Sequence, residues 1–293
     1  MMRAHKLPAT LPGRVSLVLI AIGVALALGL QPARKASAQQ PPSVRVVYES
    51  NFPMPATLTP SSGGSSEITH YVVEYASGAQ TVTHSHPYGC VATVVEGQVT
   101  NRFRTSATVA GPGKTIVTPA KEVGRHTNDS GTNRAIYFAS CFASASEPFA
   151  EPDTRFPSPV VAANVLFTGS LPLTGVPGTF DLMQRVIDMD PGSSSPELRA
   201  NARGITTVLE GQMTVRSGGR DQRYSVGQTF LAEEGDTYIV SNAGATKARL
   251  VATYALPVGV QPASPVTAPS PSGAPAGAGR LRPPSTGDAG LAE

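Results

Sequence analysis

An internal repeat most constrains what this chain can fold into. The segment Thr93-Val-Val-Glu-Gly-Gln-Val-Thr100 recurs as Thr207-Val-Leu-Glu-Gly-Gln-Met-Thr214, 114 residues later. The same offset relates three further pairs of residues: Gly78 and Gly192, Gly113 and Gly227, and Asn128 and Asn242. Because one register holds across four separate landmarks, the sequence predicts two homologous units of roughly 100 residues each, an ordinary size for a domain.

The pattern of apolar residues predicts strands and no helices. Short alternations of about four to eight residues are interrupted by Gly, Pro and Asn, and no longer window has a helical period. Examples lie at 69–75, 91–95, 134–139, 180–189 and 248–254. We therefore expect an all-β protein in which each unit is a sandwich or barrel of antiparallel strands.

Residues 1–38 have the organisation of a cleavable signal peptide. Basic side chains precede an uncharged apolar run of 16 residues at 15–30, and Ala36-Ser37-Ala38 has the small-x-small pattern of a cleavage site. The run is shorter than the about 20 residues that span a bilayer. We expect cleavage after Ala38 and a secreted, extracytoplasmic protein with no stable membrane anchor.

Composition sets the remaining boundaries. From 257 to 293 the chain is rich in Pro, Ala, Gly and Ser, which predicts a disordered tail. The Pro-rich stretch 147–159 separates the two units. The expected domains are therefore an N-terminal barrel at 43–148 and a C-terminal barrel at 160–256.

The charge balance argues against nucleic acid as a partner. Residues 1–38 hold five basic and no acidic side chains, so the remainder has 18 basic against 20 acidic side chains. Its net charge is about −2, without the basic surplus that phosphate backbones attract. We expect a small-molecule ligand or substrate instead, bound by a monomer or a homodimer.

The first unit carries a histidine motif. Gly78, His84, His86, Cys90 and Gly97 follow one another as G-x5-H-x-H-x3-C-x6-G. This spacing resembles the first signature of the cupin superfamily, G-x5-H-x-H-x3-E-x6-G, with cysteine in place of the glutamate. The resemblance covers both units and implies two tandem jelly-roll β-barrels.

A second signature of that superfamily, G-x5-P-x-G-x2-H-x3-N, is matched in part. Gly113-x5-Pro119 fits its opening, and His126 and Asn128 lie near its end. The histidine of the signature falls at Gly124 in this chain, so His126 stands two residues later, about 7 Å along an ideal strand. A bulge or loop around Gly124 would absorb that shift.

The histidines of the first unit predict a metal site. His84 and His86 are separated by one residue, so on a strand both side chains point to the same face. His126 would close a three-nitrogen face with open positions, and Cys90 would approach it after a turn. The expected metal is divalent iron, manganese, copper or zinc. His70, the fourth histidine after residue 38, is expected at the surface or in packing.

Cys90 admits several interpretations. It is a small buried hydrophobe, or a thiolate ligand, which would favour zinc or copper. By analogy, cysteine dioxygenases are cupins with a cysteine near this position, and they bind iron through three histidines. We rank a disulfide with Cys141 below burial and ligation, because pairing cannot be inferred from spacing.

The second unit lacks the corresponding ligands. The repeat places Leu198 and Ala200 at the positions of the paired histidines, Gly204 at the position of the cysteine, and Tyr238 at the position of the third histidine. The second barrel is therefore expected to be degenerate: structural, an interface, or a metal-free pocket.

Two functions of different classes fit these features. The first is a metal-dependent cupin enzyme, such as a dioxygenase-like oxidoreductase, that activates a small organic substrate or dioxygen. The alternative is a non-catalytic extracytoplasmic protein that binds a small ligand or has a structural role. The fold does not choose between them, and the sequence identifies no catalytic residue.

Overall fold

The computed structural model of the protein describes residues 42–54, 66–131, 133–144, 148–157, 159, 161–174 and 179–266. The regular structure in these residues is entirely β, with twenty strands in four five-stranded sheets. This confirms the prediction of an all-β protein. The predicted signal peptide at 1–38 and residues 267–293 of the predicted tail lie outside the described residues.

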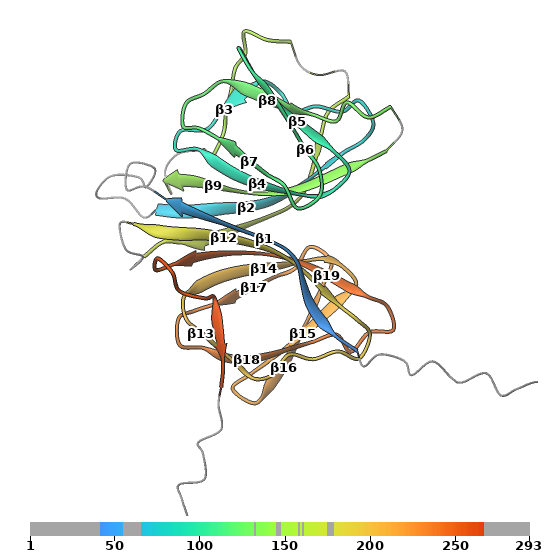
Figure 1. Cartoon of the computed structure of the whole chain (residues 1–293), viewed down its shortest axis with the longest axis vertical. Helices are drawn as coiled ribbons and strands as arrows, with labels where there is room; N and C mark the ends of the chain where they lie inside the picture. Colours follow the sequence, from blue (N-terminus) through green and yellow to red (C-terminus); the bar gives the residue numbers. More distant parts are fainter. Residues whose placement is uncertain are drawn as a thin grey trace, which may run out of the picture. The chain divides into compact units, whose positions relative to one another are not determined.

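The first barrel consists of two of the sheets (Figure 1). The sheet facing the second barrel has the order β11 (Asn164–Pro172), β2 (Ser66–Tyr75), β9 (Ala135–Ser144), β4 (Cys90–Glu96) and β7 (Thr115–Thr118). The opposite sheet has the order β10 (Glu151–Pro152), β3 (His84–Ser85), β8 (Gly124–Thr127), β5 (Val99–Phe103) and β6 (Ala107–Ala110).

The second barrel repeats this arrangement. Its sheet facing the first barrel has the order β1 (Val44–Met54), β12 (Phe180–Met189), β19 (Ala248–Leu256), β14 (Arg203–Glu210) and β17 (Thr229–Ala232). The opposite sheet has the order β16 (Arg220–Ser225), β15 (Gln212–Ser217), β18 (Thr237–Ser241), β13 (Leu198–Ala200) and β20 (Ala263–Pro265). Strands β2 and β12 begin and end 114 residues apart, as do β7 and β17, so the sequence repeat is a structural repeat.

The repeated Glu-Gly-Gln segment forms the turn between the fourth and fifth strands of each unit. Gly97 and Gly211 have φ values of +71° and +73°, in the left-handed region that favours glycine. A Cβ atom at either position would overlap the backbone carbonyl of Arg134 or Lys247. Both the dihedral angle and the close approach therefore require glycine here.

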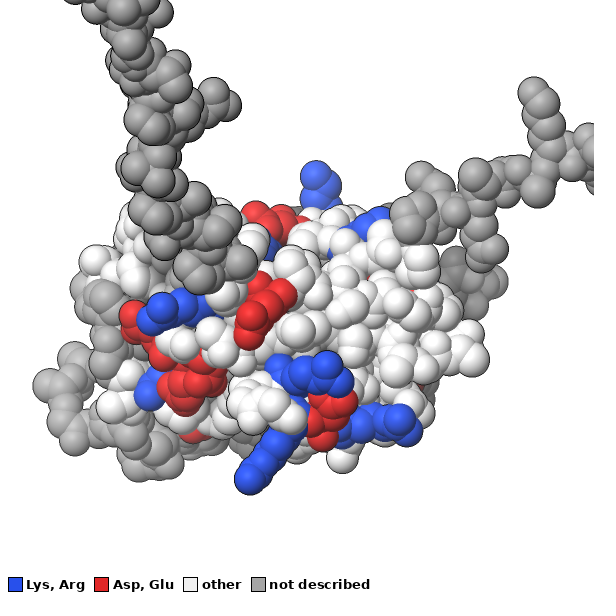
Figure 2. All heavy atoms as spheres, turned by 90° about the horizontal axis from the view of Figure 1, so that it is seen from below, with Lys and Arg blue, Asp and Glu red and all other residues white. Residues whose placement is uncertain are grey.

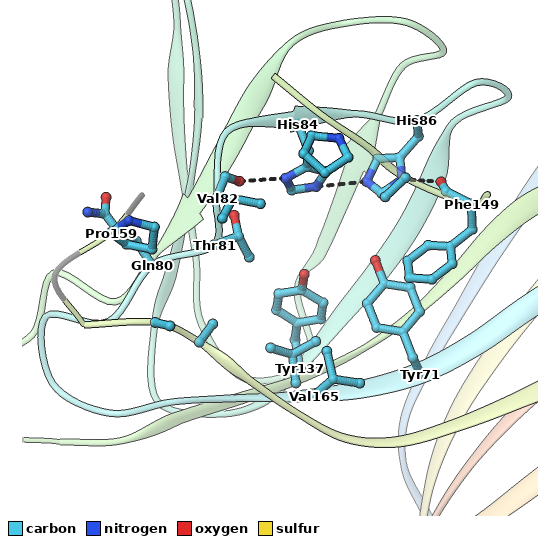
Figure 3. Close-up of a pocket in the computed structure, with 15 residues that line it drawn as sticks. Tyr71, Gln80, Thr81, Val82, His84, His86, Tyr137, Phe149, Pro159 and Val165 are labelled. Carbon is cyan, nitrogen blue, oxygen red and sulfur yellow. Dashed lines mark hydrogen bonds between the residues drawn. The ribbon is translucent and has the colours of Figure 1, made fainter. Parts of the chain in front are cut away.

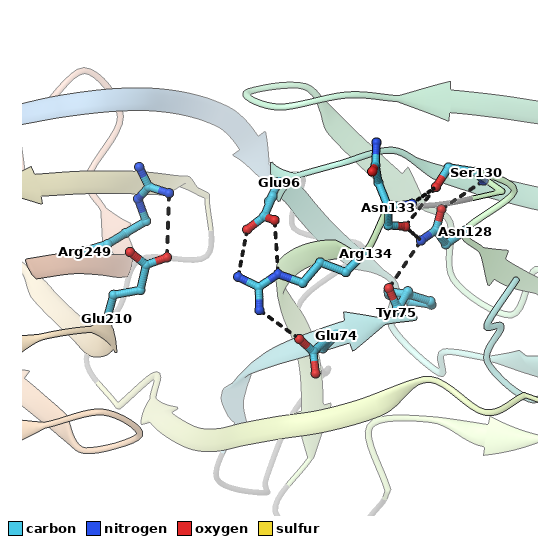
Figure 4. Close-up of polar contacts among 9 residues, drawn as sticks. All are labelled: Glu74, Tyr75, Glu96, Asn128, Ser130, Asn133, Arg134, Glu210 and Arg249. Atoms are coloured by element: carbon cyan, nitrogen blue, oxygen red, sulfur yellow. Dashed lines mark hydrogen bonds and ion pairs between the residues drawn. The ribbon is translucent and has the colours of Figure 1, made fainter. Parts of the chain in front are cut away.

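The glutamate of each repeat pairs with an arginine at or just before the start of a neighbouring strand (Figure 4). Glu96 accepts two hydrogen bonds from Arg134, at 3.0 and 3.1 Å, and Arg134 also donates to Glu74 at 3.2 Å. In the second unit Glu210 lies 3.8 Å from Arg249. These pairs are partly exposed, so each is expected to contribute at most about 1 kcal/mol.

Asn128 closes the loop that follows β8 (Figure 4). Its Nδ2 donates to the carbonyls of Tyr75 and Asn133, at 3.2 and 2.7 Å. Asn242 makes the equivalent bond to the Met189 carbonyl at 3.0 Å. The asparagine landmark of the repeat thus satisfies buried backbone groups, which are costly to leave unpaired.

The two barrels exchange a strand. By sequence position 44–54 falls in the first expected domain and 164–172 in the second. Nevertheless β1 pairs with β12 of the second barrel, from Val44 with Met189 to Met54 with Phe180. Strand β11 in turn pairs with β2 of the first barrel. Neither exchanged strand lies within the repeat, so no sequence landmark indicates where it pairs.

The facing sheets share a hydrophobic core. One cluster joins Ile68, Val91 and Phe142 of the first barrel to Leu182 and Ile205 of the second, all buried. Burial of such side chains is worth about 25 cal/mol per Å² of apolar surface. The two barrels therefore pack against each other through buried apolar side chains, as in the interior of a single domain.

A chain of buried hydrogen bonds also crosses between the barrels. Gln184 of β12 donates to Ser140 at 2.8 Å and accepts from Thr93 at 2.8 Å. Thr253 of β19 bonds to Ser140 and to His70 Nδ1, each at 2.8 Å. His70 is thus a packing residue at this interface and not a surface residue.

Residues 257–266 belong to the fold, although their composition assigns them to the disordered tail. Strand β20 pairs with β13, and Asn201 Nδ2 donates to the Gln261 carbonyl at 3.0 Å and to Ser264 Oγ at 2.8 Å. Main-chain pairing and a single asparagine order this segment, and neither requires large apolar side chains.

The surface carries both signs of charge. On the face shown in Figure 2, Lys and Arg lie interspersed with Asp and Glu. Exposed ion pairs such as Arg216 with Asp221, at 2.6 Å, contribute to this mixture. In the part of the chain that the structure describes, no helix is long and apolar enough to cross a bilayer.

The buried His70 predicts a loss of stability in acid. Desolvation lowers the pKa of His70 to about 4 from 6.5. Protonation therefore opposes folding: its cost is absent above pH 6.5 and accumulates as the pH falls towards 4. Between pH 7 and pH 4 the wild-type free energy of unfolding should fall by about 3 kcal/mol more than that of His70→Gln, measured by urea unfolding. Parallel pH profiles for the two proteins would contradict this assignment.

Candidate metal centre

Three histidines meet inside the first barrel. His84 begins β3, His86 follows that strand, and His126 lies in β8. All three are buried, and one ring nitrogen from each lies within 4.8 Å of the others. The structure thus brings together the three predicted histidine ligands.

Backbone carbonyls orient the first two imidazoles (Figure 3). His84 Nδ1 donates to the Val82 carbonyl and His86 Nδ1 to the Phe149 carbonyl, each at 2.8 Å. A carbonyl only accepts, so in both neutral rings the proton is on Nδ1 and Nε2 is a bare acceptor. The two Nε2 atoms lie 3.1 Å apart.

Two facing lone pairs at this distance repel each other unless a cation lies beside them. A proton does not fill that role at neutral pH. Burial and the neighbouring His84 ring lower the pKa of His86 to about 4, and burial also lowers the pKa of His84. The pair is therefore arranged to donate two lone pairs to one metal ion.

His126 reaches the same point despite its displacement from the expected position. Gly124 pairs with His84, and Thr127 pairs with Gln80. Between these two pairs there are three residue steps on β8, from 124 to 127, and four on the facing segment, from 80 to 84. The facing segment therefore contains one extra residue.

The same offset recurs in the second barrel, where Leu198 pairs with Tyr238 and Ser194 with Ser241, so it belongs to both repeats and does not account for the shift of His126. The expected bulge around Gly124 is absent, because β8 pairs regularly with β5 there.

The environment of Gly124 excludes a side chain there. A Cβ atom would lie 2.7 Å from the Phe103 ring and 2.8 Å from the Arg102 carbonyl. In contrast, His126 Nδ1 is buried without any hydrogen-bond partner among the described atoms. A buried imidazole nitrogen without a partner is costly, and a metal ion bound there would satisfy it.

Cys90 is not a ligand in this structure, which corrects the prediction. It forms a disulfide with Cys141, directly opposite on β9, with 4.2 Å between the Cα atoms. Both sulfurs lie within 4.8 Å of a His86 ring nitrogen, but a disulfide sulfur lacks the thiolate charge that binds metals. The disulfide, ranked lowest from sequence, is the observed state because strand register places the two cysteines face to face.

A cavity of about 240 Å³ adjoins the histidines (Figure 3). Its lining includes Tyr71 and Tyr137, which the sequence motifs do not include, and Phe149 from the segment between the two repeats. The other lining residues are Val73, Gln80, Thr81, Val82, His84, His86, Ala150, Pro152, Pro159, Ala162, Ala163 and Val165. Both tyrosines lie in apolar strands, where the sequence offers no signal that separates a site residue from a core residue.

In the second barrel, apolar and aromatic side chains occupy the positions equivalent to the histidines. Leu198 pairs with Tyr238, whose ring centroid lies 5.3 Å from that of Phe230. A Cβ atom at Gly204 would overlap the Tyr254 ring. Both clusters of potential metal ligands found among the described residues belong to the first barrel. In the second barrel Tyr238 thus belongs to a buried hydrophobic cluster, and Leu198 and Phe230 pack against that cluster.

Comparisons with known proteins identify the fold. No protein-family model and no curated protein sequence matches the chain. Among solved structures, vicilin from Solanum melongena has a TM-score of 0.51 at 11% identity, covering 66% of this chain and 75% of that one. Hazelnut (Corylus avellana) vicilin has a TM-score of 0.50 at 12% identity, covering 73% and 83%.

A third similar structure, salicylate 1,2-dioxygenase from Pseudaminobacter salicylatoxidans, has a TM-score of 0.37 at 15% identity, covering 64% of this chain and 70% of that one. At that score it adds no argument to the vicilin comparisons. The chain thus has the cupin fold in two tandem copies. These likenesses establish the fold and leave the activity to be argued from the site.

The disulfide yields a test of the ligand set. The double variant Cys90→Ala/Cys141→Ala should lose roughly 2–4 kcal/mol of unfolding free energy, because the unfolded chain is no longer cross-linked. Its metal content should equal that of the wild type, since neither sulfur is a ligand. Denaturant unfolding and elemental analysis measure the two quantities. Loss of metal from a folded double variant would restore Cys90 to the ligand set.

Proposed function

We propose that the first barrel binds one divalent transition-metal ion through His84, His86 and His126, and that this ion binds a small organic molecule in the adjoining cavity. The observation that carries this proposal is the pair of Nε2 atoms 3.1 Å apart, each left bare by a carbonyl bonded to Nδ1. The unpartnered His126 Nδ1 supports it.

The donor set ranks the candidate metals and excludes none of them. Three neutral imidazoles suit iron, copper and zinc, whereas manganese prefers oxygen ligands. With Cys90 in a disulfide, the argument that a thiolate favours zinc or copper no longer applies. Iron, copper, zinc and manganese all remain within the proposal, in keeping with three protein ligands and open positions.

The chain's own residues prepare the site for a ligand. The Val82 and Phe149 carbonyls hold two rings in one tautomer and orientation. Apolar side chains from the 149–165 segment line the cavity and exclude water from its walls. The bound ion would supply Lewis-acid polarisation or, if it is iron or copper, redox chemistry.

Two classes of function follow from this arrangement. A metal-dependent enzyme, such as an oxygenase, requires an open coordination position beside a substrate cavity, and the cavity next to His84 and His86 supports it. The alternative is a non-catalytic ligand-binding protein, which the same features also support. No carboxylate lines the cavity among the described residues, so a general base independent of the metal is not evident.

We also propose that the protein is exported. The signal-peptide pattern at 1–38 motivates this, and the Cys90–Cys141 disulfide supports it, because disulfides persist in oxidising compartments. Amino-terminal sequencing of the protein from the culture medium or envelope should begin at Gln39. Recovery of the intact chain from the cytoplasm would contradict export.

Metal content tests the central proposal. The purified protein, loaded with iron, manganese, copper or zinc and then desalted, should hold about one ion per chain. His84→Ala/His86→Ala should hold none, because one remaining imidazole binds too weakly. His70→Gln is the matched control, since this buried histidine lies outside the triad and its substitution should leave the content unchanged.

The same preparations separate the two classes of function. Turnover of a small organic substrate by the metal-loaded wild type, absent from the double variant, would establish an enzyme. Metal and ligand binding without turnover would establish the binding alternative. Failure of every metal to bind the folded wild type would refute the metal site itself.

A further inference from the structure

The charge of the site restricts which molecules it can hold. The three histidines are neutral donors, and position 90, where the cupin signature has glutamate, holds a disulfide sulfur. The fifteen lining residues include no Asp, Glu, Lys or Arg. The charge of a divalent ion would therefore be uncompensated by the protein, in a buried setting where unpaired charge is costly.

Two hydroxyl groups face the histidines across the cavity. Figure 3 shows the Tyr71 and Tyr137 side chains directed from the cavity floor towards His84 and His86. The Tyr137 ring centroid lies 5.5 Å from that of His126. A tyrosine hydroxyl has an ordinary pKa of about 10, so both side chains carry a proton at neutral pH and can donate it.

The Tyr71 hydroxyl is held by a weak acceptor. It lies 3.3 Å from Cys141 Sγ, and this sulfur has no proton because it is in the disulfide. Tyr71 is therefore the donor, and sulfur is a poor acceptor. An anionic oxygen entering the cavity would be a much stronger acceptor for the same proton.

The rest of the cavity is small and, apart from Gln80 and Thr81, mainly apolar. Val73, Val82 and Val165 line it, and the Phe149 ring packs 5.0 Å from the Tyr71 ring. A volume of about 240 Å³ holds roughly eight water-sized groups. A ligand of this size has room for one polar head and one compact apolar body.

We infer that the site selects a small monoanion with one oxyanion head and an apolar body. The head lies between the histidine face and the hydroxyls of Tyr71 and Tyr137, which donate hydrogen bonds to it. The body lies against Phe149 and the valines. A second anionic group, placed on the body and away from the metal, would lie against apolar walls with no cationic side chain to receive it, and a cation is repelled by the metal. This inference rests on the proposed function, because it names the ligand class of that site.

Three probes of similar size test the inference by calorimetry on the metal-loaded protein. Benzoate is the monoanion, nitrobenzene is its uncharged isostere, and benzylammonium is the cation. Benzoate should bind most tightly. Tyr71→Phe and Tyr137→Phe should each weaken benzoate binding on the order of ten-fold, which is the effect of losing a hydrogen bond to a charged group. Neither substitution should change the affinity for nitrobenzene much.

Tyr75→Phe is the matched control. Tyr75 belongs to the same buried tyrosine cluster, with its ring 5.4 Å from Tyr137, but it does not line the cavity. Its loss should leave benzoate affinity unchanged. Equal binding of the three probes, absent benzoate binding, or equal weakening by all three Tyr→Phe variants would overturn the inference.

Metal analysis of the same samples separates this inference from the proposed function. If the protein holds metal but prefers nitrobenzene or benzylammonium, the ligand class is wrong and the metal site stands. If it holds no metal, the proposed function fails, and the tyrosine pair is judged from the metal-free protein. The metal-free protein should still bind benzoate more tightly than nitrobenzene, and Tyr71→Phe should still lower its affinity for benzoate. A lack of that preference would also overturn the inference.

Discussion

The pairing of β11 with β2 determines where the rest of the first barrel's site can lie. After β9 the chain must travel to the edge of β2 before it can continue into the second barrel. On the way it pairs with β3 through β10 and places Phe149 beside the histidines. The segment that connects the two units therefore supplies a wall of the cavity and the carbonyl that orients His86.

Much of the fold and part of the site follow from the sequence. The repeat and the strand alternation predict two β-barrels, because both depend on local pattern and on one fixed register. The spacing of His84 and His86 predicts a shared face for the same reason. His126 also reaches the site, two residues beyond the position that the motif predicts, and its place there depends on pairing between distant parts of the chain.

The features that the sequence does not predict are those that depend on pairing across long separations. Cys90 and Cys141 become opposite only when β4 and β9 align, so the disulfide follows from register and not from spacing. Tyr71 and Tyr137 look like core residues in apolar strands until the cavity is seen. Strand β20 is ordered by main-chain pairing with β13, which amino-acid composition does not predict.

The exchange of β1 and β11 also bears on how two copies of one barrel can diverge. Each copy completes the sheet of the other, so removing either exchanged strand would leave one edge of β2 or β12 unpaired and expose its backbone groups. The second copy has no metal cluster among its described residues, and its core includes Tyr238 with Leu198 packed against it. The first copy nevertheless depends on the second for the core that they share. The candidate metal ligands thus lie in one half among the described residues, and each half depends on the other for a strand and for the shared core.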